Sequence, residues 1–106
     1  MRKTLHTNIL KQLNIELEKL LTLNKVNSNE IDIYESELKT ISVSLNNSQN
    51  KQIMSESNQQ LLEDKEQILI YKIDICRSSI SFSNKLIESF KIEISKNQKL
   101  LELFKH

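Results

Sequence analysis

The side chains of this chain that could do chemistry are few, and its single cysteine, Cys76, is the first to weigh. A nucleophilic thiol needs a histidine or a cationic pocket to lower its pKa. The nearest cation, Arg77, is adjacent in sequence, and consecutive residues point in different directions on a helix. Cys76 lies three residues after Ile73 and four before Ile80. That apolar spacing is typical of a buried cysteine with a structural role, so we expect Cys76 to pack and not to react.

The two histidines, His6 and His106, lie near opposite ends of the sequence. Neither has a cysteine or a second histidine at the spacing that a metal site requires. We therefore expect both imidazoles to be solvated surface groups, and we expect no metal site.

The carboxylates are scattered along polar stretches and do not converge on one place. Glu16 and Glu18 lie near Lys19, and Glu35 lies four residues before Lys39, which is the spacing of weak ion pairs on one helix. The sequence has no Gly-rich phosphate loop and no Ser-His-Asp arrangement at a plausible turn. A helical rod also offers no concavity in which carboxylate pKa values could shift. We expect no enzyme, no cofactor and no small-molecule substrate.

The overall charge argues against other classes of ligand. The 106 residues contain 15 Lys and Arg against 14 Asp and Glu, so the net charge of +1 gives no reason to expect nucleic acid or an acidic membrane surface. The longest apolar run, residues 68–71, is far too short to span a bilayer. A single cysteine excludes an internal disulfide framework, and a reducing compartment is the simplest interpretation. We expect a cytoplasmic protein.

The chain contains no glycine, no proline and no alanine. Selection for uninterrupted helix explains the first two absences, since glycine and proline break helices. AT-rich coding explains all three, and alanine is the best helix former, so helix selection is not the whole explanation. With either cause, the chain lacks the residue that tight turns with positive φ prefer, and β-hairpin architectures are disfavoured.

Apolar residues in the first half follow a heptad and predict a helix over residues 3–46. Asn24 and Asn27 occupy two seam positions in the middle, where Asn lowers stability but can fix register. The phase is kept across this gap, which favours one long helix, although Asn27 and Glu30 could also cap a new one. The seam positions alternate steps of three and four at Leu10, Leu13, Leu17, Leu20, Ile31, Tyr34, Leu38, Ile41 and Leu45.

A polar stretch then interrupts the seam and predicts a turn region over residues 47–57. Ser57 and Gln60 match a capping box just before Leu61, so we expect the second helix over residues 58–105.

The second half carries the stronger heptad. Isoleucine fills four consecutive a positions, which suits a helix–helix seam, and the d positions are mixed. We expect the main partner-binding surface on this seam, at Ile73, Ile80, Ile87, Phe90 and Ile94.

The pattern as a whole predicts an all-α fold with two long helices, or three if the first one breaks. We expect these helices to form a coiled-coil hairpin or part of a multi-chain helical bundle. The apolar stripe of the second half is wider than one seam, so Ile70, Ile75, Phe82, Leu86 and Ile92 would stay largely wet in a lone hairpin. Because a lone pair of helices is marginally stable at this size, we expect helical partners from other chains in a hetero-oligomer.

One segment resembles a known family. Residues 84–94 read N-K-L-I-E-S-F-K-I-E-I, within residues 61–94. The run of residues 61–94, of which residues 84–94 are the closing segment, is similar to the closing helix of the small Bli-type coiled-coil subunits of yeast BLOC complexes (biogenesis of lysosome-related organelles). The resemblance covers about a third of the chain. It implies a non-catalytic subunit in endosomal or vacuolar vesicle transport, associated with endosomes.

Two alternatives remain open. The chain is similar in outline to the short stalk proteins of bacterial type III secretion ATPases, which are antiparallel two-helix coiled coils that turn a ring or escort chaperones. Those stalks are richer in Arg, whereas this chain has only Arg2 and Arg77. A small kinetochore-complex subunit is the other alternative.

Overall fold

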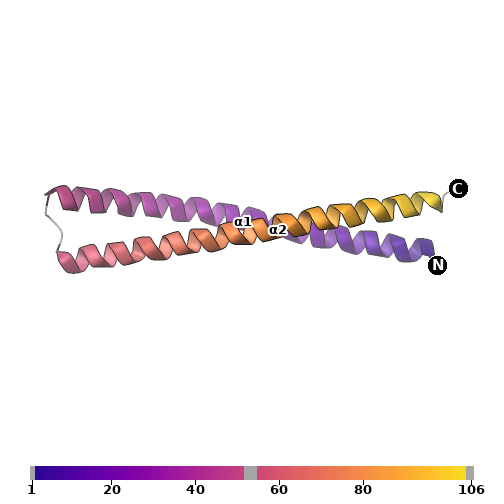
Figure 1. The fold of residues 1–106 in the computed structure, drawn as a ribbon, viewed down its shortest axis with the longest axis horizontal. Helices are drawn as coiled ribbons and strands as arrows, with labels where there is room; N and C mark the ends of the chain where they lie inside the picture. The colour runs from indigo at the N-terminus through magenta and orange to yellow at the C-terminus, as the bar shows by residue number, and fades with distance from the viewer. Residues whose placement is uncertain (1, 52–54, 105–106) are drawn as a thin grey trace. The chain divides into compact units, whose positions relative to one another are not determined.

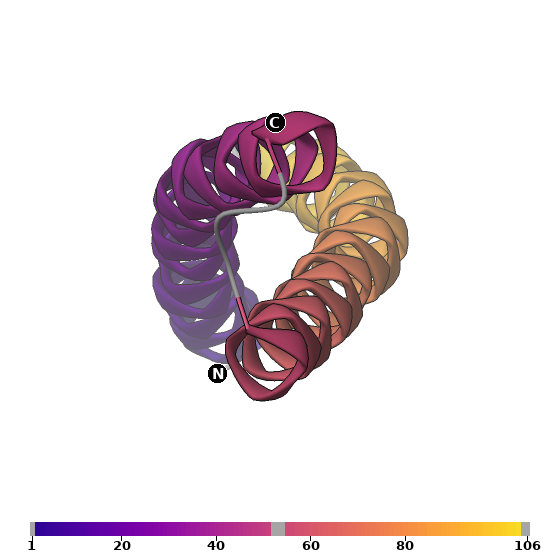
Figure 2. The ribbon, with the colours of Figure 1, turned by 90° about the vertical axis from the view of Figure 1, so that its left-hand side faces the viewer.

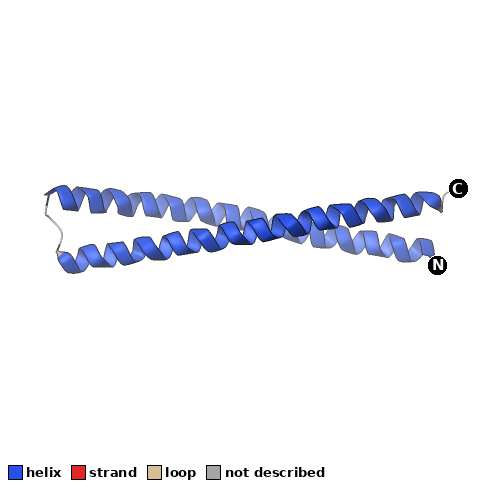
Figure 3. Ribbon diagram, viewed as in Figure 1, coloured by secondary structure: helices blue, strands red, loops and turns tan. Residues whose placement is uncertain are grey.

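The chain folds into two long α-helices (Figures 1 and 3). The computed structural model describes the backbone of residues 2–51 and 55–104 and the side chains of residues 3–47 and 55–104. Helix α1 spans Arg2–Lys51 (50 residues) and α2 spans Glu56–Leu103 (48 residues). Within the described residues there is no β-strand. The predicted all-α class with two long helices is confirmed.

Helix α1 is continuous through Asn24 and Asn27, so the three-helix alternative is excluded. It also runs through the polar residues after Leu45, five residues beyond the predicted end at 46. No proline or glycine lies in this stretch to stop it. Polar Asn, Ser and Gln have only moderate helix propensity, but they do not by themselves end a helix.

The start of α2 is set by a different serine from the predicted one. Ser55 precedes the helix, and its Oγ accepts a hydrogen bond from the backbone N–H of Asn58 at 3.3 Å. Its carbonyl accepts from the N–H of Gln59 at 2.9 Å. This is N-cap geometry, and it puts the expected Ser57 and Gln60 inside the helix. Residues 52–54 of the predicted turn region lie outside the described residues.

At its other end α2 closes with a tight turn, in which the N–H of Phe104 donates to the Leu101 carbonyl at 3.1 Å. The predicted last helical residue, 105, and the histidine at 106 lie outside the described residues.

The chain divides into two units, each of which pairs a segment of α1 with a segment of α2. The hairpin unit, Val26–Ser79, contains the connection between the helices. Its helices run antiparallel: Ser42 contacts Glu66, and Asn27 contacts Ser79. Figure 2 views the chain from the connected end of this unit. The core of the hairpin unit consists of Leu45, Leu69, Ile73 and Cys76, each 5–7% exposed.

The terminal unit comprises Met1–Lys25 and Ile80–His106. Its helices are also antiparallel, because Asn24 contacts Asn84 and His6 contacts Asn97. Among the described residues of this unit, the buried ones are one aliphatic and two polar side chains, Ile87, Ser83 and Asn97.

Neither unit encloses a sealed core. In the described part of the chain, no large side chain is less than 2% exposed. Two helices can shield a side chain from only part of its surroundings, so most seam residues stay half-buried. No stretch of either helix in that part combines the length and apolarity that a bilayer-crossing helix requires.

Candidate helix-docking surface

The five residues predicted to bind a partner lie on the seam side of α2. Ile73 and Ile87 are each 5% exposed, and Ile80, Phe90 and Ile94 are half-buried. Ile73 belongs to the hairpin unit and the other four to the terminal unit, and in each unit the chain's own α1 segment covers them. The chain therefore fills this seam by itself. That these residues also meet a partner chain stays a prediction.

The heptad phase itself is confirmed by burial. Every apolar residue assigned to the α1 seam is half-buried or buried, and so are Ile73, Ile80, Ile87, Ile94 and Leu101 at the a positions of α2. Phe104 is the exception among the d positions, with 42% exposure, because it lies beyond the end of α2. The flanking residues Ile70, Ile75, Phe82 and Ile92 are exposed as expected, whereas Leu86 is half-buried.

Cys76 sits in the seam of the hairpin unit and is 6% exposed, as its spacing predicts. Its thiol donates a hydrogen bond to Glu30 Oε2 at 3.7 Å. Burial, followed by the negative charge of Glu30, raises the pKa of the Cys76 thiol. A raised pKa keeps the group protonated and unreactive, because the thiolate is the nucleophile. Arg77 does not activate it, since its guanidinium pairs with Glu35.

Next to Cys76, Tyr34 and Lys72 meet across the same seam. The Lys72 ammonium lies 5.5 Å from the centre of the Tyr34 ring, close enough for a cation–π contact. Desolvation, with smaller contributions from Glu30, Cys76 and Glu37, raises the pKa of the Tyr34 hydroxyl. The Tyr34–Lys72 contact joins α1 and α2 in this part of the seam.

The two seam asparagines of α1 find partners on α2, as their proposed role in register requires. In the terminal unit, Asn24 Nδ2 donates to Asn84 Oδ1 at 2.9 Å. In the hairpin unit, Asn27 Nδ2 donates to Ser79 Oγ at 3.0 Å. The Asn24 Oδ1 atom is buried with no hydrogen-bond partner. A buried unpaired oxygen costs free energy, which agrees with the expected trade of stability for register.

His6 is half-buried, so its expected place in solvent is wrong. Its Nδ1 lies 3.0 Å from Asn97 Oδ1, and its ring centre lies 5.9 Å from that of Phe104. Because Asn97 Nδ2 donates to the Glu93 carbonyl at 2.8 Å, the Oδ1 atom faces the imidazole and Nδ1 carries the proton. The heptad places His6 near the seam, but one sequence does not show its partner. His106 lies outside the described residues.

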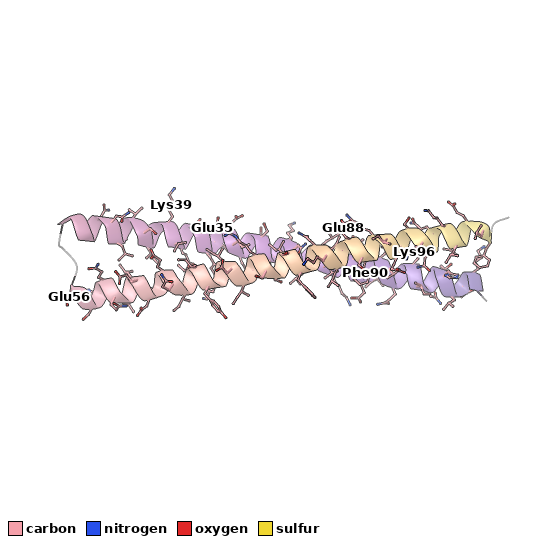
Figure 4. The ribbon with its side chains drawn as sticks, in the orientation of Figure 1. Glu35, Lys39, Glu56, Glu88, Phe90 and Lys96 are labelled. Atoms are coloured by element: carbon pink, nitrogen blue, oxygen red, sulfur yellow. The ribbon has the colours of Figure 1, made fainter. Side chains whose placement is uncertain are left out.

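Among the carboxylates noted in the sequence, Glu18 and Glu35 are exposed as expected and Glu16 is half-buried, and one ion pair differs from the expected pairing. Glu16 and Lys19 form an i,i+3 pair at 3.2 Å. Glu35, expected to support Lys39, instead accepts from Arg77 on α2 at 2.7 Å. Figure 4 shows the Lys39 side chain pointing away from α2. The long guanidinium arm reaches across the pair of helices, which the spacing within one helix does not reveal.

One groove of the hairpin unit is acidic. It is lined by both helices and includes Glu63, Asp64 and Glu66, and the last of these accepts a hydrogen bond from Ser42 at 3.3 Å. In the parts of the chain that the structure describes, no group of three His, Cys, Asp or Glu side chains is placed to hold a metal ion.

A second apolar stripe lies on the surface of α2 in the hairpin unit. Leu61, Ile68 and Ile75 repeat at seven-residue intervals, at the heptad position two after a, and they are 54%, 54% and 51% exposed. The same position of the α1 segment holds Val26 and Ile33, which are 47% and 56% exposed. An exposed apolar side chain at every heptad is the pattern that a further helix would bury.

These two stripes flank one groove of about 440 Å³ between α1 and α2. Thr40, which continues the α1 stripe, and Ile68, from the α2 stripe, both line it, so both stripes lie on the same side of the hairpin unit. The rest of its lining includes Ile41 and Leu69, and the charged Glu37, Lys65 and Lys72. We call this side the apolar face of the hairpin unit: Val26, Ile33, Thr40, Leu61, Ile68 and Ile75, with Glu37, Lys65 and Lys72 beside the groove.

The main heptad predicts that Ile75 is exposed, but it does not by itself reveal the stripe. The signal was present in the sequence, because residues 61, 68 and 75 are a second seven-residue repeat next to the main seam. It is found when every heptad position is tested for apolar residues and not only a and d.

No protein-family model, curated protein or solved structure matches this chain.

Proposed function

We propose that this protein is a non-catalytic coiled-coil subunit of a heteromeric helical complex. One observation supports this most directly: in the described residues, 17 large apolar side chains are exposed, against five buried hydrophobic residues. Exposed apolar area of this extent marks a binding surface. A subunit that buries these side chains against partner helices gains the hydrophobic free energy that the isolated chain forgoes.

The kind of partner follows from the spacing of these side chains. A helix presents residues seven apart on one face, and a second helix packs into such a face by inserting side chains between them. Flat or globular partners do not require that period. We therefore propose amphipathic helices of other chains as partners, with no nucleic acid and no small-molecule substrate.

A role in endosomal or vacuolar vesicle transport is the more specific proposal, and it is supported by the resemblance of residues 84–94 to the closing helix of Bli-type subunits. In this segment Phe90 faces the seam and is half-buried, whereas Ile92 is 56% exposed. Ile92 is thus the apolar side chain of the segment that remains free for a partner helix.

The antiparallel pairing of two helices favours a second candidate, a stalk or chaperone-escort protein of a bacterial type III secretion ATPase. Pairs such as Ser42–Glu66 and His6–Asn97 establish the antiparallel direction in each unit. The stalk proteins have the same antiparallel pairing of two helices.

Affinity purification of the tagged native protein followed by mass spectrometry tests the proposal. We expect co-purifying helical proteins in fixed stoichiometry, and a variant with Ile92→Glu should lose part of them. A matched variant, Lys91→Glu, changes an exposed position beside it and should retain all of them. Endosomal co-subunits would support the transport role, a hexameric ATPase the stalk role, and kinetochore proteins the remaining alternative. A chain that purifies alone from its native source would contradict the proposal.

A further inference from the structure

The apolar face of the hairpin unit has a charge pattern that is complementary to itself. Its α1 edge carries Glu37, and its α2 edge carries Lys65 and Lys72. All three side chains line the same groove, in which Lys65 and Lys72 lie two helical turns apart, about 10 Å along α2. Among the described residues, neither Glu37 nor Lys65 forms an ion pair. Both charges are therefore available to a molecule that docks on this face.

We propose that this face binds a second copy of the chain, and that two hairpin units form an antiparallel four-helix bundle. The proposal goes beyond the function above, which requires only partners of different sequence. The two copies are related by a twofold axis that runs parallel to the helices. This axis places α1 of one copy over α2 of the other at the same level.

The charges select this arrangement over the other face-to-face dimer. With the axis along the helices, Glu37 of each copy meets Lys65 and Lys72 of the other copy. With the axis across the helices, α1 would lie over α1, so acidic edge would meet acidic edge and basic edge would meet basic edge. Like charges brought together at an interface are unfavourable, and the arrangement that pairs opposite charges is preferred.

The apolar side chains match in the same arrangement. Within the hairpin unit, Glu30 contacts Cys76 and Asn27 contacts Ser79, which fixes the pairing level of the two helices. At that level Ile33 lies opposite Ile75, and Thr40 lies opposite Ile68, as their shared groove also shows. A twofold axis along the helices therefore stacks Ile33 of one copy on Ile75 of the other, twice.

The size of the face is sufficient for a dimer. Residues 56–79 of α2 form a segment about 36 Å long, and two helices side by side are about 20 Å wide. The face thus covers roughly 700 Å², close to the approximately 800 Å² per partner of a standard stable interface.

Sedimentation velocity of the purified full-length chain at several concentrations tests the proposal. We expect a concentration-dependent dimer. Ile68→Glu with Ile75→Glu should weaken it more than about 100-fold, because four charges would be placed in the new core. The matched control is Val43→Glu, which also puts a charge on a half-exposed aliphatic position of the hairpin unit, 50% exposed, at a heptad position that points away from α2. This control should leave the dimer unchanged, and circular dichroism should show the same helix content for all variants.

Charge reversal tests the twofold geometry itself. Glu37→Lys alone, and Lys65→Glu combined with Lys72→Glu, should each weaken the homodimer roughly tenfold or more. An equimolar mixture of the two variants should recover the affinity, because every lysine at these positions then meets a glutamate on the other chain. Pairing within one chain cannot produce that recovery.

Several outcomes would overturn the proposal: a monomer at every concentration, equal loss from Val43→Glu, or no recovery in the mixture. If the purified chain is monomeric while the tagged native protein still recovers helical partners, and loses them with Ile68→Glu and Ile75→Glu, then the face binds a different protein. That result would reject self-association and leave the proposed function in place.

Discussion

The hairpin unit and the terminal unit are built on the same heptad but fill it differently. Four of the five buried hydrophobic residues, Leu45, Leu69, Ile73 and Cys76, belong to the hairpin unit. The terminal unit buries Ile87 together with two polar residues, Ser83 and Asn97. The comparison shows that the spacing of apolar residues determines where the two helices meet. The residue types at those positions determine how much the contact between the helices contributes to the stability of the fold. We infer that the hairpin unit supplies most of the stability and that the terminal unit supplies selectivity of pairing.

The most direct way to break this comparison is to put a charge into each seam. Ile73→Asp in the hairpin unit should destabilise the chain by several kcal/mol, roughly 3–5, because the carboxylate would be buried in the apolar seam. Ile94→Asp in the terminal unit should cost less, since its site is only half-buried. Urea unfolding followed by circular dichroism measures both values. Equal losses at the two positions would mean that the two units do not differ in stability.

A smaller change addresses the buried thiol. Cys76→Ser should cost about 1–3 kcal/mol, because a more polar group then occupies a packed site. The same substitution should also reduce the dependence of folding stability on pH. Because burial raises the thiol pKa in the folded state, the folded protein holds its proton more tightly than the unfolded chain. The stability that Cys76 contributes is then complete below the ordinary thiol pKa of about 9 and is lost as the pH rises above it.

Melting temperatures measured from pH 7 to pH 10 test this dependence. The wild-type protein should lose stability toward the alkaline end, and the Cys76→Ser variant should lose less. Tyr34, whose hydroxyl pKa is also raised, remains in the variant and contributes in the same direction at higher pH. Identical pH profiles for the two proteins would show that the thiol is not shielded.

The polar pair of the terminal unit permits a finer test. Asn97→Leu alone should cost about 1 kcal/mol, because it leaves half-buried His6 Nδ1 without its acceptor. Asn97→Leu combined with His6→Leu should be neutral or stabilising, since both polar partners are then replaced. Thermal unfolding of the two single variants and the double variant gives the coupling energy. Additive effects would mean that this hydrogen bond does not contribute.

The smallest expected effect belongs to the ion pair of the hairpin unit. Arg77→Gln should change stability by less than about 1 kcal/mol, because both Arg77 and Glu35 are exposed and water screens their attraction. The effect should decrease further in high salt. A loss as large as that of Cys76→Ser would show that this ion pair, and not the apolar seam, dominates the hairpin unit.

Much of the fold could be predicted from the sequence because the heptad is a repeating signal. It identifies the seam residues of both helices, including Asn24 and Asn27, and it places Cys76 correctly. The helix ends were harder to predict, because Ser55 and Ser57 are both suitable caps by residue type. The partners of His6 and Glu35 could not be predicted from the sequence. Each partner lies on the other helix, and its identity depends on the level at which the two helices pair.

The candidate docking surface could be predicted only in part. Seam residues such as Ile80 and Ile87 have the strongest pattern, but the chain uses that pattern to pair with itself. The exposed apolar stripe of α2 in the hairpin unit is the weaker repeat at Leu61, Ile68 and Ile75, which lies outside the main seam. A single sequence does not distinguish a stripe used within the chain from one used between chains.

The antiparallel pairing has a consequence for the order in which the chain folds. In the hairpin unit, Ser42 and Glu66 are 24 residues apart in sequence, whereas His6 and Asn97 in the terminal unit are 91 apart. Closing a longer loop costs more chain entropy, and contacts between distant residues form more slowly. Folding should therefore begin beside the connection between α1 and α2, and helix pairing should then proceed toward the two ends of the chain. Contacts near the ends, such as that of His6 with Asn97, are then the last to form during folding and the first to open.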